Sequence, residues 1–427
     1  MKAKKKLPWT VFIAIALAII IGPLTGTDKD IFGVTYYSIF NLLGTLFLNA
    51  LTLVVIPLVS SSIITGIARI GNETDFGRLG LKTISFYLGT MLMAIVIGMV
   101  FANIIKPGLS QAGKPIVAEA QMQLDKLEQQ MAKQGTTGNF SRFMTQIIPG
   151  NITDLLSTRQ MLGLIFFSML FGYALSKVGG QPGATLLAFW QGIFQAMIQI
   201  THLILKTLPL GVFCLVAREF ATASLESIFS LVKFFITVIL GLGVFMFIGL
   251  PLLLKFVGKV SPIRHFKAMG PALLTAFSTS SSSATLPVTI ECVEKRAGVS
   301  NRITSLVVPL GVSINLSGSA LYECVAALFV AQAYGLSLPM TTQFAVLLLA
   351  LFTSIGVAGV PSGSLVAIIV ILGSIGLPPE GIGLFLAVDR LLDMARTTVN
   401  IFSDSCCAVL VAKTEGEKEV LTKDVYT

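Results

Sequence analysis

The chain has 427 residues, of which 54% are hydrophobic and only 12% are charged, and its formal net charge is +9. Soluble domains carry about 25% charged residues, so the composition excludes an ordinary soluble domain and indicates a membrane protein. The excess of Lys and Arg is read as the cytoplasmic bias of membrane proteins, since no aromatic and basic pattern typical of nucleic-acid binding accompanies it.

Eight apolar stretches are long enough to cross a bilayer, which takes roughly 20 residues. They lie at about 9–25, 35–66, 83–105, 160–178, 193–217, 226–256, 303–333 and 381–412. The basic start "MKAKKK" lacks a good cleavage site after the first stretch, which favours an uncleaved first span. Residues 107–158 interrupt the apolar pattern with polar sequence and are expected to lie on the outer face of the membrane.

Two further apolar segments, about 268–292 and 342–376, are interrupted by "STSSSSATLP" and "SIGVAGVPSGS". Basic residues flank the first segment on both sides, whereas the flanks of the second hold no Lys or Arg. Because basic loops are cytoplasmic, we expect the first segment to enter and return from the cytoplasm and the second from outside. Two such hairpins of opposite orientation are typical of a secondary transporter built from inverted repeats. The alternative is two kinked spans with no site.

The seventh stretch contains "GVSINLSGSALYE", with Gly, Asn and Ser in mid-helix. Gly318 lowers helix propensity by about 1 kcal/mol relative to alanine, so we expect an unwound turn that exposes the carbonyls of Gly311, Ser313 and Asn315. Glu323 follows as an intramembrane carboxylate that could carry a proton. The alternative is a protonated, hydrogen-bonded structural group.

The densest polar cluster, "DRLLDMARTTVNIFSD", lies inside the last apolar stretch. Asp389, Asp393, Arg396, Asn400 and Asp404 are three or four residues apart, which places them near one helix face. The arginine fork fits a carboxylate, and Asp393 can meet an ammonium group, so the pair suits an acidic amino acid. An internal salt bridge without a ligand is the alternative. It is disfavoured because inserting each charged residue into a membrane costs ~2.5–3.5 kcal/mol.

Four motifs, "SSSSATLP", "NLSGSALYE", "AGVPSGS" and "DMARTTVNIFSD", occur in this order. Through them, and over nearly the whole chain, the sequence resembles prokaryotic members of the glutamate/aspartate transporter family, also called dicarboxylate/amino acid:cation symporters. The resemblance implies an all-α polytopic membrane protein with eight transmembrane helices and two oppositely oriented re-entrant helical hairpins. It also implies an elevator-type homotrimer in the cell (inner) membrane with both termini cytoplasmic.

The resemblance further implies a scaffold domain for trimerisation and a transport domain that moves against it. The scaffold would comprise residues 1–82 and 159–220. The transport domain would comprise span three at 83–106 and residues 221–412. Residues 107–158 would be an extracellular-side polar excursion, and 413–427 a cytoplasmic tail.

Matched position by position, Arg396 would bind the side-chain carboxylate of L-glutamate or L-aspartate, and Asp393 would bind its amino group. Family members for dicarboxylates lack this Asp, and those for neutral amino acids lack this Arg. The rest of the implied pocket consists of Asn400, Thr397, Ser319, Ser281, Ser282, Ser283, Val360 and Ser364.

The coupling ion is where the sequence departs from the sodium-coupled relatives, which carry "NMDGT" where this chain has "NLSGS". Leu316 replaces a Met, and Ser317 replaces a sodium-ligating Asp. On span three "YLGTM" lacks a further hydroxyl. Because sodium binds oxygen ligands, we expect the third sodium site to be lost. The ligands implied for two remaining sodium sites are Asp404, Gly311, Asn315 and Asn400, and Ser313, Ser354, Ile355 and Val357.

Glu323 occupies a position that holds Glu in proton-carrying members, so proton coupling or a reduced sodium stoichiometry is expected. The predicted function is a secondary active symporter of acidic amino acids, with co-transported protons or sodium and no other cofactor. The alternatives are a sodium-coupled glutamate/aspartate or C4-dicarboxylate symporter and a passive channel, which would more naturally use rings of like charge. An enzyme is disfavoured because no pairing of a nucleophile with a base is evident.

Overall fold

The computed structural model describes residues 9–31, 33–72, 77–110, 161–222, 225–356 and 363–422. It is a helical bundle, as predicted, with one short antiparallel ribbon, β1 (Asp30–Ile31) and β2 (Val34–Thr35). The ribbon, which the sequence analysis missed, turns at Gly33, whose φ of 79° suits glycine. Most of the expected polar excursion at 107–158 lies outside the described residues, as do Val357 and Val360.

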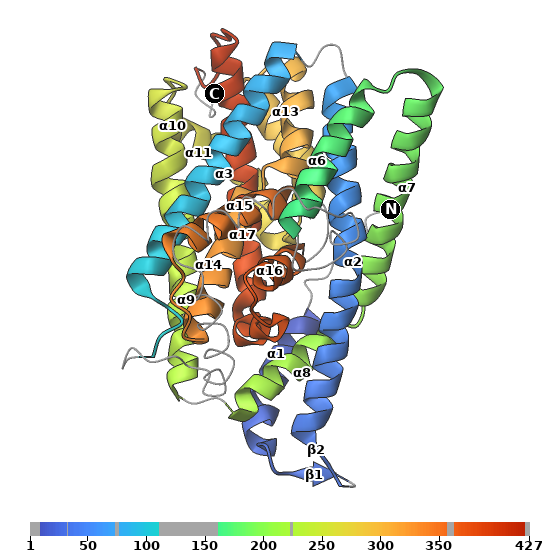
Figure 1. Cartoon of the computed structure of the whole chain (residues 1–427). Coiled ribbons are helices and arrows are strands. Elements are labelled where there is room, and N and C mark those ends of the chain that lie inside the picture. The colour runs from blue at the N-terminus through green and yellow to red at the C-terminus, as the bar shows by residue number, and fades with distance from the viewer. Residues whose placement is uncertain are drawn as a thin grey trace.

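The first half of the described chain forms long helices (Figure 1). They are α1 (Trp9–Thr25), α2 (Tyr36–Asn72), α3 (Gly77–Ile105), α6 (Met161–Lys177), α7 (Gly180–Leu205) and α8 (Leu208–Thr222). By length and composition α2 and α3 can each cross a membrane.

The second half contains more helical segments, several of which are interrupted by π-helical turns or by breaks. They are α9 (Leu225–Val244), the π-helical turn η5 (Phe245–Gly249), α10 (Leu250–Phe256), α11 (Pro262–Thr279), α12 (Ser282–Glu291), the π-helical turn η6 (Cys292–Arg296), α13 (Asn301–Ile314), α14 (Ser317–Ala333), α15 (Met340–Gly356), α16 (Gly363–Ser374), the 3₁₀ turn η7 (Pro379–Leu384) and α17 (Leu386–Thr414). By the same criteria, the stretches 227–256 and 301–333 can cross a membrane.

The expected fifth span at 193–217 is corrected by the structure. The chain forms two helices there, α7 and α8, which bend by 58° at residues 206–207. Pro209 explains the break, because it has no N–H to donate and its ring clashes with the carbonyl four residues earlier. The bent pair is apolar and long enough to form a fifth crossing.

Two of the polar motifs coincide with breaks between helices, whereas residues 357–362 of the third lie outside the described residues. Ser280 adopts the left-handed conformation, with φ 49° and ψ 37°, between α11 and α12. Asn315 and Leu316 leave helical geometry between α13 and α14, so the predicted unwound turn is present. It begins later than expected: the carbonyl of Gly311 stays in the helix, where it accepts from the Asn315 backbone N–H at 2.8 Å.

Two groups of helices pack mainly among themselves. In one group α1 packs on α8, and α2 packs on α6, α7 and α8. In the other, α17 runs through the middle of the molecule (Figure 1) and contacts α3, α9, α11, α13 and α14. The groups meet where α8 contacts α17 and α2 contacts α15 and α16.

The segment after α17, residues 415–422, joins the ends of several helices. Glu415 pairs with Lys82 near the start of α3, and the Ser300 backbone N–H donates to the Glu417 carboxylate at 3.1 Å. Leu421 donates its N–H to the Ala297 carbonyl at 2.8 Å. The segment therefore fastens α3, η6 and the start of α13 to one another.

Candidate functional site

All five polar residues predicted to share a helix face lie on α17. Its amino-terminal half carries Asp389, Arg390, Asp393 and Arg396, here termed the charged cluster. The Arg396 side chain is 2% exposed, whereas those of Arg390 and Asp393 are 21% and 25% exposed. The charged cluster therefore contains one buried cation, Arg396, and one partly exposed ion pair, Arg390 with Asp393.

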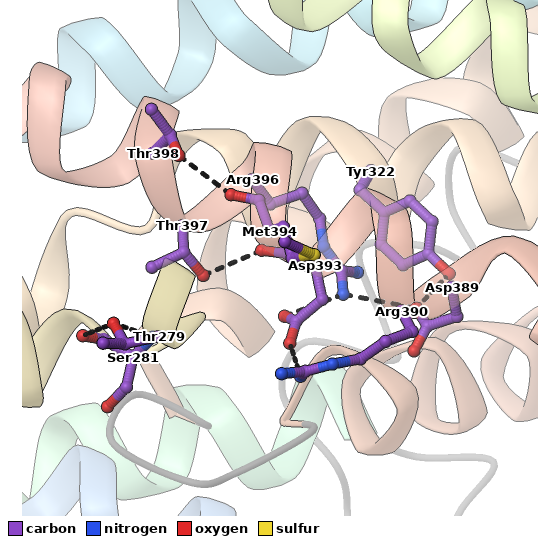
Figure 2. Close-up of polar contacts among 10 residues, drawn as sticks. All are labelled: Thr279, Ser281, Tyr322, Asp389, Arg390, Asp393, Met394, Arg396, Thr397 and Thr398. Carbon is purple, nitrogen blue, oxygen red and sulfur yellow. Dashed lines mark hydrogen bonds and ion pairs between the residues drawn. The ribbon is translucent and has the colours of Figure 1, made fainter. Parts of the chain in front are cut away.

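The Arg396 guanidinium lies at the centre of the charged cluster (Figure 2). Its Nη2 donates to Asp389 Oδ1 at 3.2 Å and to Asp393 Oδ1 at 3.1 Å. The guanidinium carbon lies 3.8 Å from the centroid of the Tyr322 ring, which is a cation–π contact. The Tyr322 hydroxyl donates to Asp389 Oδ1 at 2.7 Å, so Tyr322 and Asp389 together fix the guanidinium.

Two donor nitrogens of Arg396, Nε and Nη1, are buried and have no hydrogen-bond partner among the described residues. Leaving a buried donor unpaired costs about 1–3 kcal/mol, and more for a charged group. Arginine presents several N–H groups in a plane that fits a carboxylate. The guanidinium can thus accept a further anionic partner without giving up both aspartates.

Asp393 lies at the edge of a small pocket between the two groups of helices. Its Oδ2 accepts from Arg390 Nη1 at 2.9 Å. The pocket is lined by Asp389, Arg390 and Asp393 and by the apolar side chains of Val11, Leu208, Val212, Leu365 and Leu386. A small polar molecule in this pocket would meet both signs of charge on one wall.

Thr397 and Asn400 follow on α17, but their polar atoms are held within the protein. The Thr397 hydroxyl donates to the Asp393 carbonyl at 2.8 Å. Asn400 Oδ1 accepts from the Gly318 backbone N–H at 2.7 Å, and its Nδ2 donates to Ser319 Oγ at 3.2 Å. Asn400 therefore ties α17 to the first turn of α14, beside the charged cluster.

Ser281, at the break between α11 and α12, lies on the Thr397 side of the charged cluster, away from Asp389 (Figure 2). Ser281 caps α12, since its side chain accepts from the Ala284 backbone N–H at 3.3 Å. Ser281 and Ser282 are half-buried and Ser283 is exposed. The helix α12 contacts α17, so the break lies near the helix that bears the arginines.

Glu323 is fully buried on α14 and faces the end of α15. Its Oε2 accepts from Ser354 Oγ at 2.8 Å and from Thr353 Oγ1 at 3.2 Å. Its Oε1 has no partner among the described residues. Ser364, at the start of α16, lies beside the same carboxyl group, which thus links α14 to both helices of the second interrupted segment.

A second polar group, here termed the amide network, surrounds the break between α13 and α14 and consists of Asn315, Ser317, Ser403 and Asp404. All four residues are 0% exposed. Asn315 Nδ2 donates to Asp404 Oδ1 at 2.9 Å and to Ser403 Oγ at 3.1 Å. Its Oδ1 accepts from Ser317 Oγ at 2.8 Å and from Thr90 Oγ1 at 3.2 Å.

Asp404 is buried beside Gly311, where an added Cβ would lie 2.7 Å from the carboxyl carbon. Its Oδ2 has no partner among the described residues, which leaves one carboxylate oxygen for a cation or a proton. Ser313 does not join this arrangement, because its side chain is exposed and donates to the Pro309 carbonyl at 3.4 Å. Ser354, at the end of α15, donates to Glu323 at 2.8 Å, so its hydroxyl is engaged in the contact with that carboxyl group.

Sequence reasoning missed the contacts of Tyr322, Arg390 and Ser403. Arg390 could have been found, since it precedes Asp393 by one helical turn, the spacing of an ion pair. Ser403 is adjacent to Asp404 on α17, and adjacent helical residues do not face each other, so their spacing did not predict that both belong to the amide network. Tyr322 comes from another helix, and its contact with Arg396 depends on how α14 packs against α17.

An inward-facing cluster of both charges in a bundle of apolar helices is typical of membrane transporters. The chain belongs to the sodium:dicarboxylate symporter family, whose model matches residues 7–414. The chain is therefore a transporter and not an enzyme.

Similar proteins come from bacteria and mammals. A proton/sodium-glutamate symport protein of Geobacillus stearothermophilus is 36% identical over 96% of this chain and 95% of its own length. A proton/glutamate-aspartate symporter of Escherichia coli (strain K12) is 33% identical over 98% of both chains. Excitatory amino acid transporter 3 of Mus musculus is 34% identical over 96% of this chain and 86% of its own length.

Proposed function

We propose that the chain is a secondary active symporter of acidic amino acids, with L-glutamate or L-aspartate as substrate. The observation that carries the proposal is Arg396, a buried guanidinium with two donor nitrogens that have no partner among the described residues. Its Nη2 lies 3.1 Å from Oδ1 of the partly accessible Asp393. A cation and an anion at this spacing match the side-chain carboxylate and the ammonium of an acidic amino acid. Relatives named as glutamate or aspartate symporters support the same substrate class.

In the proposed complex the substrate's side-chain carboxylate binds Arg396 and its ammonium binds Asp393. Thr397 and Asn400 hold its main-chain end, and the serines at the break before α12 hold its α-carboxylate. Ser281 and its neighbours supply hydroxyls and the first N–H groups of α12, which favour an anion. The remaining members of the proposed pocket are Ser282, Ser283, Ser319, Val360 and Ser364.

We propose altered cation coupling, with the third sodium site of sodium-coupled relatives lost. Asn315 supports this, because the uncharged hydroxyls of Ser317 and Thr90 donate hydrogen bonds to its side-chain oxygen Oδ1. The free Oδ2 of Asp404 supports one remaining sodium site. Glu323, with one oxygen unpaired, is the proposed proton carrier.

We further propose that the protein works as an elevator-type homotrimer with both termini in the cytoplasm. The two groups of helices correspond to the proposed scaffold and transport domains: α1, α2, α6, α7 and α8 pack together, and α17 packs with α3, α9, α11, α13 and α14. The pocket between Asp393 and the wall formed by Val11 and Val212 lies at their contact. This supports a substrate site on the face that one group presents to the other.

The test is uptake into liposomes that contain the purified protein. Labelled aspartate and glutamate are supplied with a sodium gradient alone, a proton gradient alone, and either gradient collapsed by an ionophore. We expect accumulation that follows a proton gradient, or a sodium gradient of reduced stoichiometry. Equilibration without accumulation under every gradient would indicate a channel, and uptake of succinate with no uptake of either amino acid would indicate a C4-dicarboxylate symporter.

A further inference from the structure

Both oxygens of the Asp393 carboxylate are occupied by arginines. Oδ1 accepts from Arg396 Nη2 at 3.1 Å, and Oδ2 accepts from Arg390 Nη1 at 2.9 Å. A substrate ammonium that binds Asp393 needs an acceptor there, so it has to take the place of one arginine or share its oxygen. The surroundings of the two arginines decide which one an incoming ammonium displaces from Asp393.

Arg396 is the firmly held cation of the two. It is 2% exposed, it also donates to Asp389 at 3.2 Å, and it lies against the Tyr322 ring. These contacts remain when it loses Asp393. Displacing Arg396 altogether would leave a charge buried without its partners, which is costly.

Arg390 is held much more weakly. Its side chain is 21% exposed, and its one ion-pair partner among the described residues is Asp393. Its Nε is buried and has no hydrogen-bond partner among the described residues, so the side chain is not optimally placed in this arrangement. It also lines the pocket from which a substrate would reach Asp393. A partly exposed ion pair of this kind contributes little free energy, so an incoming ammonium can replace it.

We infer that Arg390 is a specificity-determining residue, which occupies the ammonium position on Asp393 until an amino acid displaces it. This inference rests on the proposed function. With Arg390 in place, a C4-dicarboxylate, which has no ammonium, meets an Asp393 whose charge is already neutralised. Without Arg390, the same dicarboxylate meets a carboxylate with one partner fewer and is repelled, while an amino acid binds with one competitor fewer.

The experiment measures two constants in proteoliposomes: KM for labelled aspartate and the inhibition constant Ki of succinate. The variant is Arg390→Met, which keeps an apolar stem and removes the donor. Arg390→Leu, which also removes the donor, serves the same purpose should the Met variant not fold. Lys295→Met is the matched control, since this lysine is 73% exposed and pairs only with Glu291 among the described residues.

In Arg390→Met we expect the succinate Ki to rise and the aspartate KM to fall, each by about two- to fivefold, the range of a partly exposed ion pair. The ratio of the succinate Ki to the aspartate KM should therefore rise by about four- to twenty-five-fold. The ratio should stay at the wild-type value in Lys295→Met. A ratio that is unchanged or lower in Arg390→Met would overturn the inference. Failure of the proposed function would instead be seen in the wild-type protein, as no uptake of either acidic amino acid.

Discussion

The two halves of α17 carry polar groups that differ in how they are satisfied. The charged cluster near its start is built from ion pairs, and two of its side chains remain 21% and 25% exposed at a pocket. The amide network farther along is fully buried and linked by neutral hydrogen bonds. Ion pairs at a pocket can exchange partners with an incoming charge, whereas in the amide network most polar atoms of the described residues already have partners inside the protein.

This difference suggests that the two polar groups on α17 have different roles. The charged cluster is suited to a substrate that carries both charges, and the amide network is suited to holding α13, α14 and α17 together without an ion. Asp404 is the exception in the amide network, because one of its carboxylate oxygens is unpaired. Four predictions test these roles, beginning with the largest expected effect.

Arg396→Gln should abolish uptake of acidic amino acids, with a loss of about 100-fold or more. Truncating one partner of a buried hydrogen-bonded charge pair costs about 2–5 kcal/mol, and the variant removes the buried cation that is proposed to bind the substrate's side-chain carboxylate. Uptake of labelled aspartate and glutamate is the measurement, with Lys295→Gln as an exposed control. Uptake at the wild-type rate would contradict the proposal that the charged cluster binds the substrate.

Asp404→Asn should raise the sodium concentration needed for half-maximal uptake by roughly tenfold, which corresponds to about 1.4 kcal/mol. The change removes the unpaired anionic oxygen, while a carbonyl oxygen can still accept from Asn315. The sodium dependence of aspartate uptake is the measurement, and Asp28→Asn, on an exposed loop, is the control. Unchanged sodium dependence would place the cation elsewhere.

Glu323→Gln should remove the stimulation of uptake by a proton gradient while substrate exchange continues. The amide oxygen can still accept from Ser354 and Thr353, so packing is retained but the exchangeable proton is gone. Uptake under a pH gradient is compared with exchange in preloaded liposomes, and Glu291→Gln, which is 61% exposed, is the control. Persistent proton-driven accumulation would assign Glu323 a structural role.

Ser317→Asp should give the smallest of the four effects, a sodium-dependent rise in melting temperature that exceeds that of the wild type. A carboxylate beside Asn315 is destabilising when buried without a cation, and sodium should offset this. At a sodium concentration about five times Kd, binding stabilises a protein by about 1 kcal/mol. The change in melting temperature on adding sodium is measured for the variant and the wild type, and an equal response in both would argue against a restorable sodium site.

The sequence was most informative where a pattern lies within one helix. The spacing of Asp389 through Asp404 predicted a shared helix, and the Gly and Ser run predicted the break that the structure has at Asn315 and Leu316. It was least informative where two helices meet. The stacking of Tyr322 on Arg396 and the hydrogen bond from Ser354 to Glu323 depend on helix packing, which a local pattern does not encode.

The bend between α7 and α8 shows that hydropathy alone does not predict where a helix ends. An apolar run gave the position of a span, but the proline at 209 carried the information that the run is two helices. Local backbone chemistry therefore overrides hydropathy in setting where a helix ends. The serine-rich break before α12 was predicted correctly because it combines both kinds of evidence, a gap in hydropathy and a run of residues that cap helices.

The segment that follows α17 has a practical consequence for handling the protein. Glu415, Glu417 and Leu421 contact three separate helix ends. A reporter or affinity label fused directly after Thr414, in place of this segment, would remove all of these contacts. A fusion placed after Thr422 would leave them intact. The last helix thus has a usable fusion boundary about eight residues beyond its own end, counted from the contacts that the segment makes.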